Sequence, residues 1–274
     1  MPEGPEIRRA ADAIAEVLEG QTIDTVRFGL PKLRNKSRQL RGHRITGIET
    51  RGKALLTHFD HGLSIYSHNQ LYGVWKVVKG HKLPKTNRSL RLLLQTDRHS
   101  AILYSASDIS VWHTEELPQH PFLKKIGPDI MDTSLTWRDV AARLRDPRFA
   151  NKKLAALYLD QAFLAGNGNY LRSEIIHDAR LDPHARPGEL TRGELGRLAR
   201  STLTISRRSY QTGGITLAPR LSKSLEKRGL TRKWRRFFVF GRTDYPSYHC
   251  GENIVRTEVG SRRLYHCPAC QPDD

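Results

Sequence analysis

The spacing of apolar residues changes once along the chain, and this change constrains the fold more than any other feature of the sequence. From about residue 21 to residue 115, apolar and polar residues alternate in short segments that are separated by clusters of Gly, Asp, Asn and Pro. Such alternation predicts antiparallel strands in a β sandwich or barrel. From about residue 135 to residue 210, the apolar residues recur at helical spacing instead. We therefore expect an α+β protein, with an N-terminal antiparallel β sandwich followed by a helical lobe.

The individual elements follow from the same periodicity. One amphipathic helix is expected at residues 6–18, ahead of the sandwich, because its apolar residues are three or four apart and Gly20 follows as a stop. The expected strands cover residues 22–28, 43–49, 54–59, 63–67, 73–78, 90–95 and 101–105. The expected helices of the second lobe cover residues 137–144, 152–164, 170–179 and 190–205. With a linker at 119–132 and a short β-like tail, we predict three domains, at residues 1–125, 135–225 and 238–272.

Basic residues greatly outnumber acidic ones. The chain has 46 Lys and Arg against 28 Asp and Glu, a formal net charge of +18 and a pI near 10.2. Such an excess favours a polyanionic partner, most simply a nucleic acid, although a merely soluble basic protein would have the same composition. The excess is densest between Arg220 and Arg242, where nine basic residues accompany the single acid Glu226.

The sequence has the features of a protein that works in the cytoplasm. No apolar run approaches the roughly 20 residues that a membrane-spanning helix needs. The first residues, MPEGPEIRRA, lack the apolar core of a signal peptide. We therefore expect a cytoplasmic, nucleoid-associated protein with no membrane partner. The three cysteines fall within the last 25 residues, and this crowding predicts a bound metal rather than a disulfide framework.

The first six residues place a potential nucleophile beside two carboxylates. Removal of Met1, which a small second residue favours, would leave Pro2 with a secondary amine. Because an α-amino group has an ordinary pKa of about 7.7–8, a useful fraction is neutral at physiological pH and can attack an aldehyde-like carbon. Glu3 could act as an acid or base, and Glu6 suits the positive end of the helix that it opens. The plainer alternative is an ordinary helix start with acidic capping residues.

A glycine-rich turn separates two of the helical patterns. Its sequence, from Asp160 to Tyr170, is DQAFLAGNGNY. Backbone amides at such a turn and at the next helix start can bind phosphate, and Asn169 can add a side-chain amide. A dinucleotide-binding loop is excluded, because a helical pattern rather than a strand precedes the glycines. A plain helical hairpin is the alternative that stays open.

Four segments, in order along the chain, resemble one enzyme family. MPEGPEIRRA, TRGKALL at residues 50–56, SHNQLYGVW at residues 67–75 and the glycine-rich turn are similar to motifs of the formamidopyrimidine-DNA glycosylase and endonuclease VIII family. The resemblance covers essentially the whole chain, and the first three segments resemble the bacterial endonuclease VIII branch. It implies a bifunctional base-excision repair enzyme whose partner is damaged DNA, with a helix–two-turn–helix lobe and a β-hairpin zinc finger. We also expect a monomer that needs no soluble redox cofactor.

The resemblance implies a mechanism in which Pro2 attacks C1′ of the damaged nucleotide and displaces the base. The resulting Schiff base permits β-elimination and then δ-elimination, which leaves a one-nucleotide gap. Glu3 is the implied general acid, which protonates the sugar as its ring opens, and Lys53 matches the catalytic lysine of the family. From the residues alone, Lys53 follows Gly52 in a predicted tight turn and would be interpreted as a solvated surface lysine.

The same resemblance implies several DNA contacts. A damaged base must leave the duplex to be cut, and Gln70, Leu71 and Tyr72 match the residues that fill the space it leaves. Without the resemblance, Leu71 and Tyr72 would be expected to pack between strands. Lys125 matches a basic DNA-contact position, and Asn169 matches a phosphate contact of the helix–two-turn–helix motif.

The cysteine-bearing tail resembles the zinc finger of the family, with one departure. Cys267 and Cys270 form one Cys-x2-Cys pair, but Ser247 replaces the first cysteine of the pair that ends at Cys250. A neutral serine hydroxyl is a poor zinc ligand. We therefore expect either zinc that is bound by the three thiolates and His249, or a weakened finger that is held by packing alone.

Three further assignments concern the tail and its support. Arg262 matches the fingertip arginine, which would grip a phosphate bidentately and assist δ-elimination, and counting back from Cys267 favours it over Arg263. Glu174 matches a carboxylate that supports the active site. His266 is a poorer candidate for the fourth zinc ligand, because adjacent residues in a strand point to opposite faces.

The implied substrates are oxidised pyrimidines such as thymine glycol and dihydrouracil. Three alternatives stay open: a purine-directed enzyme of the same family that excises 8-oxoguanine and formamidopyrimidines, a catalytically inactive DNA-binding relative, and a basic zinc-ribbon protein that binds RNA. The residues at 70–72 argue against the first alternative. The intact Pro2, Glu3 and Lys53 argue against the second, and only charge supports the third.

Overall fold

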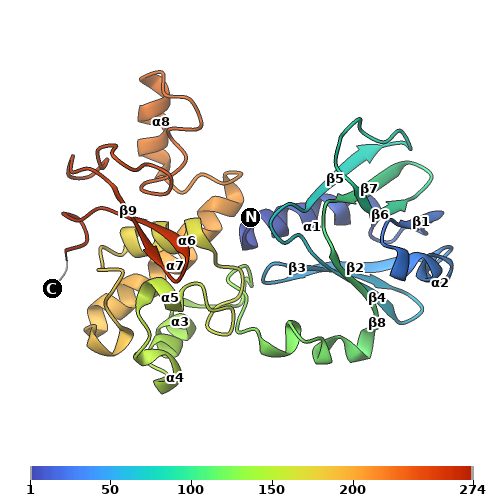
Figure 1. Cartoon of the computed structure of the whole chain (residues 1–274), viewed down its shortest axis with the longest axis horizontal. Helices are drawn as coiled ribbons and strands as arrows, with labels where there is room; N and C mark the ends of the chain where they lie inside the picture. Colours follow the sequence, from blue (N-terminus) through green and yellow to red (C-terminus); the bar gives the residue numbers. More distant parts are fainter. Residues whose placement is uncertain (1, 273–274) are drawn as a thin grey trace. The chain divides into compact units, whose positions relative to one another are not determined.

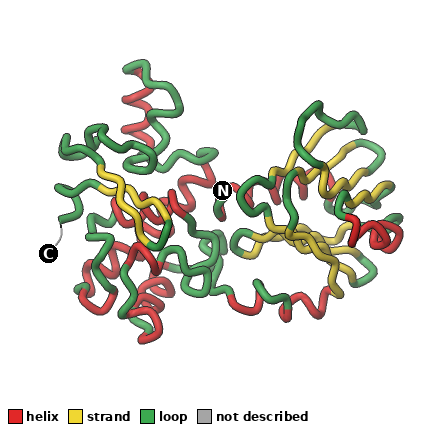
Figure 2. Tube along the Cα trace, viewed as in Figure 1, coloured by secondary structure: helices red, strands yellow, loops and turns green. Residues whose placement is uncertain are grey.

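The computed structural model describes residues 2–272 and divides into two compact units, Met1–Lys125 and Ile126–Asp274 (Figure 1). The first unit contains one long helix and two antiparallel sheets, and the second is mainly helical with a two-stranded hairpin near its end (Figure 2). The predicted α+β class, with a β sandwich followed by a helical part, is confirmed. No described helix is long and apolar enough to cross a membrane.

Two four-stranded sheets form the sandwich of the first unit. One has the order β2 (Ile45–Arg51), β3 (Ala54–Phe59), β4 (Leu63–His68) and β8 (Asp108–His113). The other has the order β1 (Thr25–Phe28), β6 (Leu90–Gln95), β7 (His99–Tyr104) and β5 (Val74–Lys79). Every neighbouring pair in both sheets is antiparallel.

Helix α1 (Gly4–Leu18) joins the two sheets through one buried face. Its residues Ile7, Ala11, Ile14 and Leu18 recur at helical spacing and are all buried. The helix contacts β2 and β3 of one sheet and β5 and β7 of the other. The core that it shares with the sheets includes alternate residues of the strands, so apolar burial accounts for the predicted alternation.

Several short elements of the first unit were not predicted from the sequence. These are β8, the paired helices η1 (Pro31–Lys36) and α2 (Ser37–Leu40), and the turns η2 (Thr114–Gln119) and η3 (Leu123–Lys125). Each of them buries at most one residue, so burial does not repeat along the element and leaves no apolar periodicity to detect.

The second unit is built around one buried helix. Its helices are α3 (Trp137–Leu144), α4 (Pro147–Ala150), α5 (Leu154–Leu157), α6 (Asn169–Asp178), η4 (Pro187–Glu189), α7 (Arg192–Gln211) and α8 (Pro219–Lys227), followed by the hairpin β9 (Val255–Val259) and β10 (Arg262–His266). Every residue of α6 from Tyr170 to His177 is buried. This helix contacts α5, α7 and β10, so it connects the helical core to the hairpin.

The helix predicted at residues 152–164 is wrong beyond Leu157. Asp160 redirects the chain there, because its carboxylate accepts a hydrogen bond from Ala162 N–H at 2.9 Å and its carbonyl accepts one from Phe163 N–H at 3.0 Å. Aspartate competes in this way with helical hydrogen bonds. The predicted helix at 190–205 is α7, which continues to Gln211.

Part of the basic segment at 220–242 has a structural use. Arg232 and Arg236 donate to the backbone carbonyls of residues 213–214 at 2.5 Å and 2.8 Å. Arg242 is buried, and its guanidinium lies 3.6 Å from the ring centroid of Tyr248. These arginines hold the chain between α7 and the hairpin, where a separate apolar core forms beneath α8.

Replacement of Ile14 by alanine tests the role of α1 in joining the sheets. Ile14 is fully buried, so Ile14→Ala should lower the free energy of unfolding of the first unit by about 2–5 kcal/mol. Glu16→Ala, on the exposed side of the same helix, should change it by less than about 0.5 kcal/mol. Denaturant unfolding followed by tryptophan fluorescence measures both; equal losses in the two variants would contradict this account of the core.

Candidate active site

Glu3 ends the extended chain that leads into α1. Its φ is −111°, and its backbone N–H donates to the Glu6 carboxylate at 3.1 Å. Arg9 binds the other oxygen of Glu6 at 3.1 Å, so Glu6 is an ordinary capping residue. Glu3 is only 3% exposed, whereas Pro2 before it is partly exposed, and Met1 lies outside the described residues. The helix start therefore fixes the backbone beside Pro2 and withdraws Glu3 from bulk water.

Lys53 lies in the tight turn between β2 and β3. Gly52 and Lys53 form the two-residue loop between the paired residues Arg51 and Ala54, and Gly52 has a φ of +63°, which glycine tolerates best. Lys53 is only 7% exposed. The structure therefore contradicts the alternative of a solvated surface lysine, because lysines are almost never buried unless they are paired.

His68, which has no role in the sequence analysis, lies within electrostatic reach of Lys53. It pairs with Ala54 of β3 and with Asp108 of β8. Burial lowers the pKa of His68; the charge of Asp108 opposes this shift and that of Lys53 adds to it. The Nδ1 atom of His68 accepts a hydrogen bond from Gln70 N–H at 3.0 Å. This bond connects the strand next to the lysine turn with the loop that follows.

The loop between β4 and β5 exposes two large apolar side chains. Leu71 is 55% exposed and Tyr72 is 69% exposed. The only other large apolar side chain exposed among the described residues is Tyr245. The alternative in which Leu71 and Tyr72 pack between strands is therefore wrong.

The same loop is held in one conformation from several sides. Gly73 N–H donates to the Asn69 carbonyl at 2.7 Å, and a Cβ atom at position 73 would lie 2.3 Å from that oxygen. The side-chain oxygen of Gln70 accepts a hydrogen bond from the Ser107 hydroxyl at 2.7 Å. Arg88 donates to the Tyr72 carbonyl at 2.7 Å. The exposed side chains of Leu71 and Tyr72 therefore belong to a loop whose backbone is held in one conformation.

Lys125 is exposed at the end of η3. Its N–H donates to the Phe122 carbonyl at 3.1 Å, and the Phe122 ring packs edge-on against His68 with centroids 5.6 Å apart. An aromatic cluster thus supports the segment that carries this lysine.

In the second unit, Asn169 is the first residue of α6, directly after the glycine-rich turn. The Gln161 side chain shapes this turn, because it donates to the Asn167 carbonyl at 3.0 Å and accepts from Gly166 N–H at 3.1 Å. Arg172 lies 3.5 Å from the side-chain oxygen of Asn169. The first backbone amides of α6 point out of its N-terminus, as in helix starts that bind phosphate.

Glu174 is a fully buried carboxylate that binds backbone rather than substrate. It accepts hydrogen bonds from the N–H groups of three consecutive residues, Phe238 at 2.8 Å, Val239 at 2.9 Å and Phe240 at 2.9 Å, and from the Thr216 hydroxyl. It therefore anchors on α6 the segment that leads into the hairpin.

The tip of the hairpin presents Arg262. Gly260 and Ser261 form the two-residue turn, with φ values of +55° and +58°, and Arg262 pairs with Val259. Arg262 and Arg263 are both exposed. The Arg263 carbonyl accepts a hydrogen bond from the buried Arg172 at 2.7 Å, which connects the hairpin to α6.

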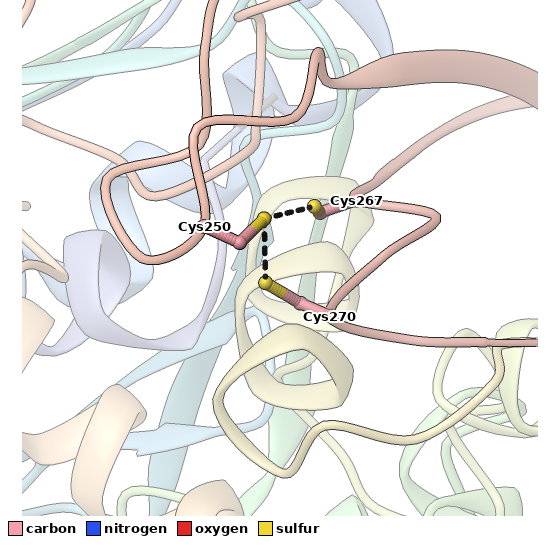
Figure 3. Close-up of side chains that lie close together, drawn as sticks. All are labelled: Cys250, Cys267 and Cys270. Carbon is pink, nitrogen blue, oxygen red and sulfur yellow. Dashed lines mark hydrogen bonds between the residues drawn. The ribbon is translucent and has the colours of Figure 1, made fainter.

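The three cysteines converge from two turns (Figure 3). The Cys250 sulfur lies 3.4 Å from that of Cys267 and 3.3 Å from that of Cys270. Such a group of thiols can bind a metal ion. The structure does not bring His249 into this group: its ring stacks on Phe238, with centroids 5.3 Å apart and planes 9° apart.

The second cysteine turn is attached to the end of α6 through Gln271. The Gln271 side chain donates to the Leu181 carbonyl at 2.9 Å, so its oxygen accepts from Cys267 N–H and from His177 Nδ1, both at 3.1 Å. His177 is buried, and burial lowers its pKa to about 4, with the hydrogen bond to Gln271 acting in the opposite direction.

Comparison with known protein families identifies similarity along the whole chain. Residues 1–107 match the family model described as the formamidopyrimidine-DNA glycosylase N-terminal domain. The chain is 47% identical over 271 residues to endonuclease 8 of Escherichia coli O17:K52:H18, covering 99% of this chain and 100% of the relative. It is 45% identical, with the same coverage, to endonuclease 8 of Enterobacter sp. strain 638.

Solved structures show the same fold at lower sequence identity. One is the complex of Lactococcus lactis Fpg (MutM) with DNA that contains an oxidized pyrimidine, with a TM-score of 0.82, 22% identity and coverage of 99% of this chain and 100% of that chain. Another is Lactococcus lactis Fpg bound non-covalently to DNA with an AP site, with a TM-score of 0.81, 21% identity and the same coverage.

The buried His177 predicts a loss of stability in acid. The imidazole has an ordinary pKa of 6.5 and a pKa of about 4 in the folded protein. Between these values the unfolded chain binds a proton that the folded chain excludes, so stability falls as the pH falls, by about 3 kcal/mol in all. Urea unfolding of the second unit measured from pH 7 to pH 4 should show this slope.

His177→Gln keeps a side-chain donor and removes the titration, so it should flatten that slope. His184→Gln, at a partly exposed position of the same unit, serves as the matched control and should leave the slope as in the wild type. Parallel curves for the wild type and His177→Gln would show that His177 is not the group responsible.

Proposed function

Because the chain belongs to the formamidopyrimidine-DNA glycosylase and endonuclease VIII family, we propose that it excises oxidised pyrimidines from DNA and then cleaves the strand at the abasic site. The observation that carries this proposal is the burial of Glu3 and Lys53, two charged residues at a helix start and a hairpin turn, where side chains are ordinarily exposed. Two relatives bear the name endonuclease 8, which supports the pyrimidine-directed branch.

In the proposed reaction, Pro2 is the nucleophile once Met1 has been removed. Its neutral secondary amine attacks C1′ of the damaged nucleotide, and the bond between C1′ and the base breaks with its electron pair on the base. The amine proton passes to the departing base, Glu3 donates a proton to the ring oxygen of the sugar, and the ring opens as an iminium forms between Pro2 and C1′. Because Glu3 is buried, bulk water competes little with it as the proton donor at this step.

The iminium then allows the strand to be cut twice. Loss of a proton from C2′ expels the 3′ phosphate in β-elimination, and loss of a further proton expels the 5′ phosphate in δ-elimination. Water hydrolyses the remaining iminium and releases Pro2. Lys53 is proposed to bind a phosphate or donate a proton beside the reacting sugar, and Arg262 to hold the leaving phosphate bidentately.

The DNA contacts are proposed to combine a wedge with phosphate binding. Leu71 and Tyr72 would fill the space that the extruded base leaves, with Gln70 beside them. Asn169 and Lys125 would bind phosphates, so affinity should depend strongly on salt.

Cys250, Cys267 and Cys270 are the residues proposed to hold a structural zinc ion. Three thiols that lie within 4.8 Å of one another suit zinc, which prefers sulfur and nitrogen ligands. When bound, the ion would tie the two ends of the hairpin region together. Its role is structural, and Arg262 at the hairpin tip is the residue that would reach DNA.

Borohydride trapping on abasic DNA tests the proposed nucleophile. Wild-type protein should form a covalent adduct at Pro2, located by peptide mass spectrometry, and should excise thymine glycol faster than 8-oxoguanine. Pro2→Gly should slow excision by at least about 100-fold, because loss of a catalytic group has effects of this order. Pro5→Ala, a matched change within the first turn of α1, should retain the adduct. An adduct at another residue, or active protein that retains Met1, would overturn the mechanism.

The wedge predicts a loss of activity without a loss of stability. In the double variant Leu71→Ala, Tyr72→Ala, excision of thymine glycol from duplex DNA should fall by about 10-fold or more, because an unstacked base is no longer compensated. Unfolding free energy should change by less than about 0.5 kcal/mol, since both side chains are exposed.

Two comparisons sharpen the wedge experiment. Cleavage of a single-stranded abasic site should be nearly unchanged in the double variant, because no duplex has to open. Tyr245→Ala removes the third large apolar side chain that is exposed among residues 2–272 and should leave duplex activity unaltered. An equal loss on single-stranded and duplex substrates would count against the wedge.

A further inference from the structure

The cysteine site is built from two similar turns, only one of which has both of its cysteines. In the first turn, Ser247 N–H donates to the Glu252 carbonyl at 2.8 Å and Gly251 N–H donates to the Ser247 carbonyl at 3.1 Å. In the second, Gln271 N–H donates to the Cys267 carbonyl at 3.0 Å. Each turn offers its first and fourth residues to the centre. The backbone of the first turn is therefore intact, although its first side chain is a hydroxyl.

The Ser247 hydroxyl lies beside the three thiols. Its oxygen lies 3.7 Å from the Cys270 sulfur, within hydrogen-bonding distance of that thiol. Four donors at about 2.3 Å from a common tetrahedral centre lie about 3.8 Å from one another. The distances of 3.3 Å and 3.4 Å between thiols and 3.7 Å to the hydroxyl come close to this arrangement. Ser247 is only 6% exposed, so its hydroxyl is directed into the protein.

His249, the alternative candidate for the fourth zinc ligand, is held away from the thiols. The His249 ring stacks on Phe238, and its centroid lies 5.7 Å from that of the His177 ring. The backbone N–H of His249 donates to the Ser247 hydroxyl oxygen at 3.2 Å. A rotation of His249 toward the thiols would give up the stacking. Among the described residues, the group of possible ligand atoms at this place contains only the three cysteines.

A hydroxyl differs from a thiolate in charge and in affinity for zinc. Three thiolates leave a complex with zinc at a net charge of −1, whereas four leave −2, and a neutral alcohol oxygen is a weak donor to this ion. Cys250 is exposed, so an external ligand can approach the site. We propose that this protein holds zinc with three thiolates and the Ser247 hydroxyl, and therefore binds it more weakly and exchanges it faster than a site with four cysteines. This inference rests on the proposed zinc site.

The hairpin region has other supports that make a weak metal site tolerable. Glu174 binds three backbone amides at its entry, and Gln271 attaches its second turn to α6. Arg242 donates to the Pro246 carbonyl at 2.8 Å and stacks on Tyr248 within the first turn. Folding of this region therefore depends less on the metal than in a finger without a core, and zinc occupancy can follow the free zinc concentration by mass action.

Zinc release from the reduced full-length protein tests this inference. Protein loaded with one equivalent of zinc is mixed with a chromogenic chelator, and the rate and the equilibrium of transfer are measured. Ser247→Cys should tighten binding and slow release by at least about 10-fold. His249→Ala should behave as the wild type. Ser247→Ala should release zinc faster than the wild type, because it lacks the hydroxyl ligand, and release at the wild-type rate would count against Ser247 as a ligand.

Cobalt substitution gives a second, spectroscopic measurement of the same site. Wild-type protein should show a tetrahedral cobalt spectrum with three thiolate-to-cobalt contributions, and Ser247→Cys should raise the charge-transfer intensity by about a third. Wild-type release as slow as that of Ser247→Cys, or a His249→Ala spectrum altered from wild type, would overturn the assignment of Ser247. Wild-type protein that takes up no zinc and no cobalt would overturn the zinc site itself, whereas borohydride trapping reports separately on the proposed enzyme activity.

Discussion

The buried carboxylate of Glu174 is the interaction on which the second unit depends most. Three consecutive amides, those of Phe238, Val239 and Phe240, converge on it. Burial raises the pKa of Glu174, and these hydrogen bonds oppose that shift and satisfy the buried carboxyl oxygens. Because Glu174 lies on α6, the helix that starts at Asn169 also fixes the entry to the hairpin that carries Arg262. Two groups proposed to bind phosphate are thereby placed on one rigid support, with Arg172 and Gln271 as additional ties.

In the first unit, tight turns and a helix start fix the positions of such side chains, whereas in the second unit a buried hydrogen-bond network does so. The start of α1, the two-residue turn at Gly52 and the short loop before Gly73 each place a side chain with a proposed function at a point where the chain reverses or begins an element. Their positions are set by strand pairing and capping, which extend into the sandwich core. Side chains such as Leu71 can remain exposed because the backbone of the loop, rather than packing of the side chain, fixes their position.

Long periodic elements were predictable from the sequence because burial repeats along them, as α1, α7 and most strands of the sandwich illustrate. The short helices at 31–40 and strand β8 were not, since each buries only one residue and burial therefore does not repeat along it. The segment after Leu157 was predicted as helix because its apolar residues are also those of a buried turn, and only the Asp160 hydrogen bonds distinguish the two. Burial of Lys53 and the place of His68 beside it arise from strand register, which no local pattern specifies. The sequence shows that Ser247 departs from the family pattern of cysteines. The stacking of His249 on Phe238, which keeps His249 out of the thiol group, is a tertiary contact that the sequence does not specify.

The arginines that are hydrogen-bonded to residues 213–214 reduce the number of positive charges that can reach the phosphates of a polyanion. A guanidinium fixed on a carbonyl retains its charge but loses the freedom to move toward a phosphate, and Arg242 is enclosed altogether. Release of counterions from DNA scales with the cations that reach the phosphates rather than with formal charge. The +18 of the sequence is thus an upper bound, and, Arg232 aside, the basic side chains of this segment that stay exposed to a polyanion are those of Arg220, Lys223 and Lys227 on α8 and of Arg228 and Lys233 after it.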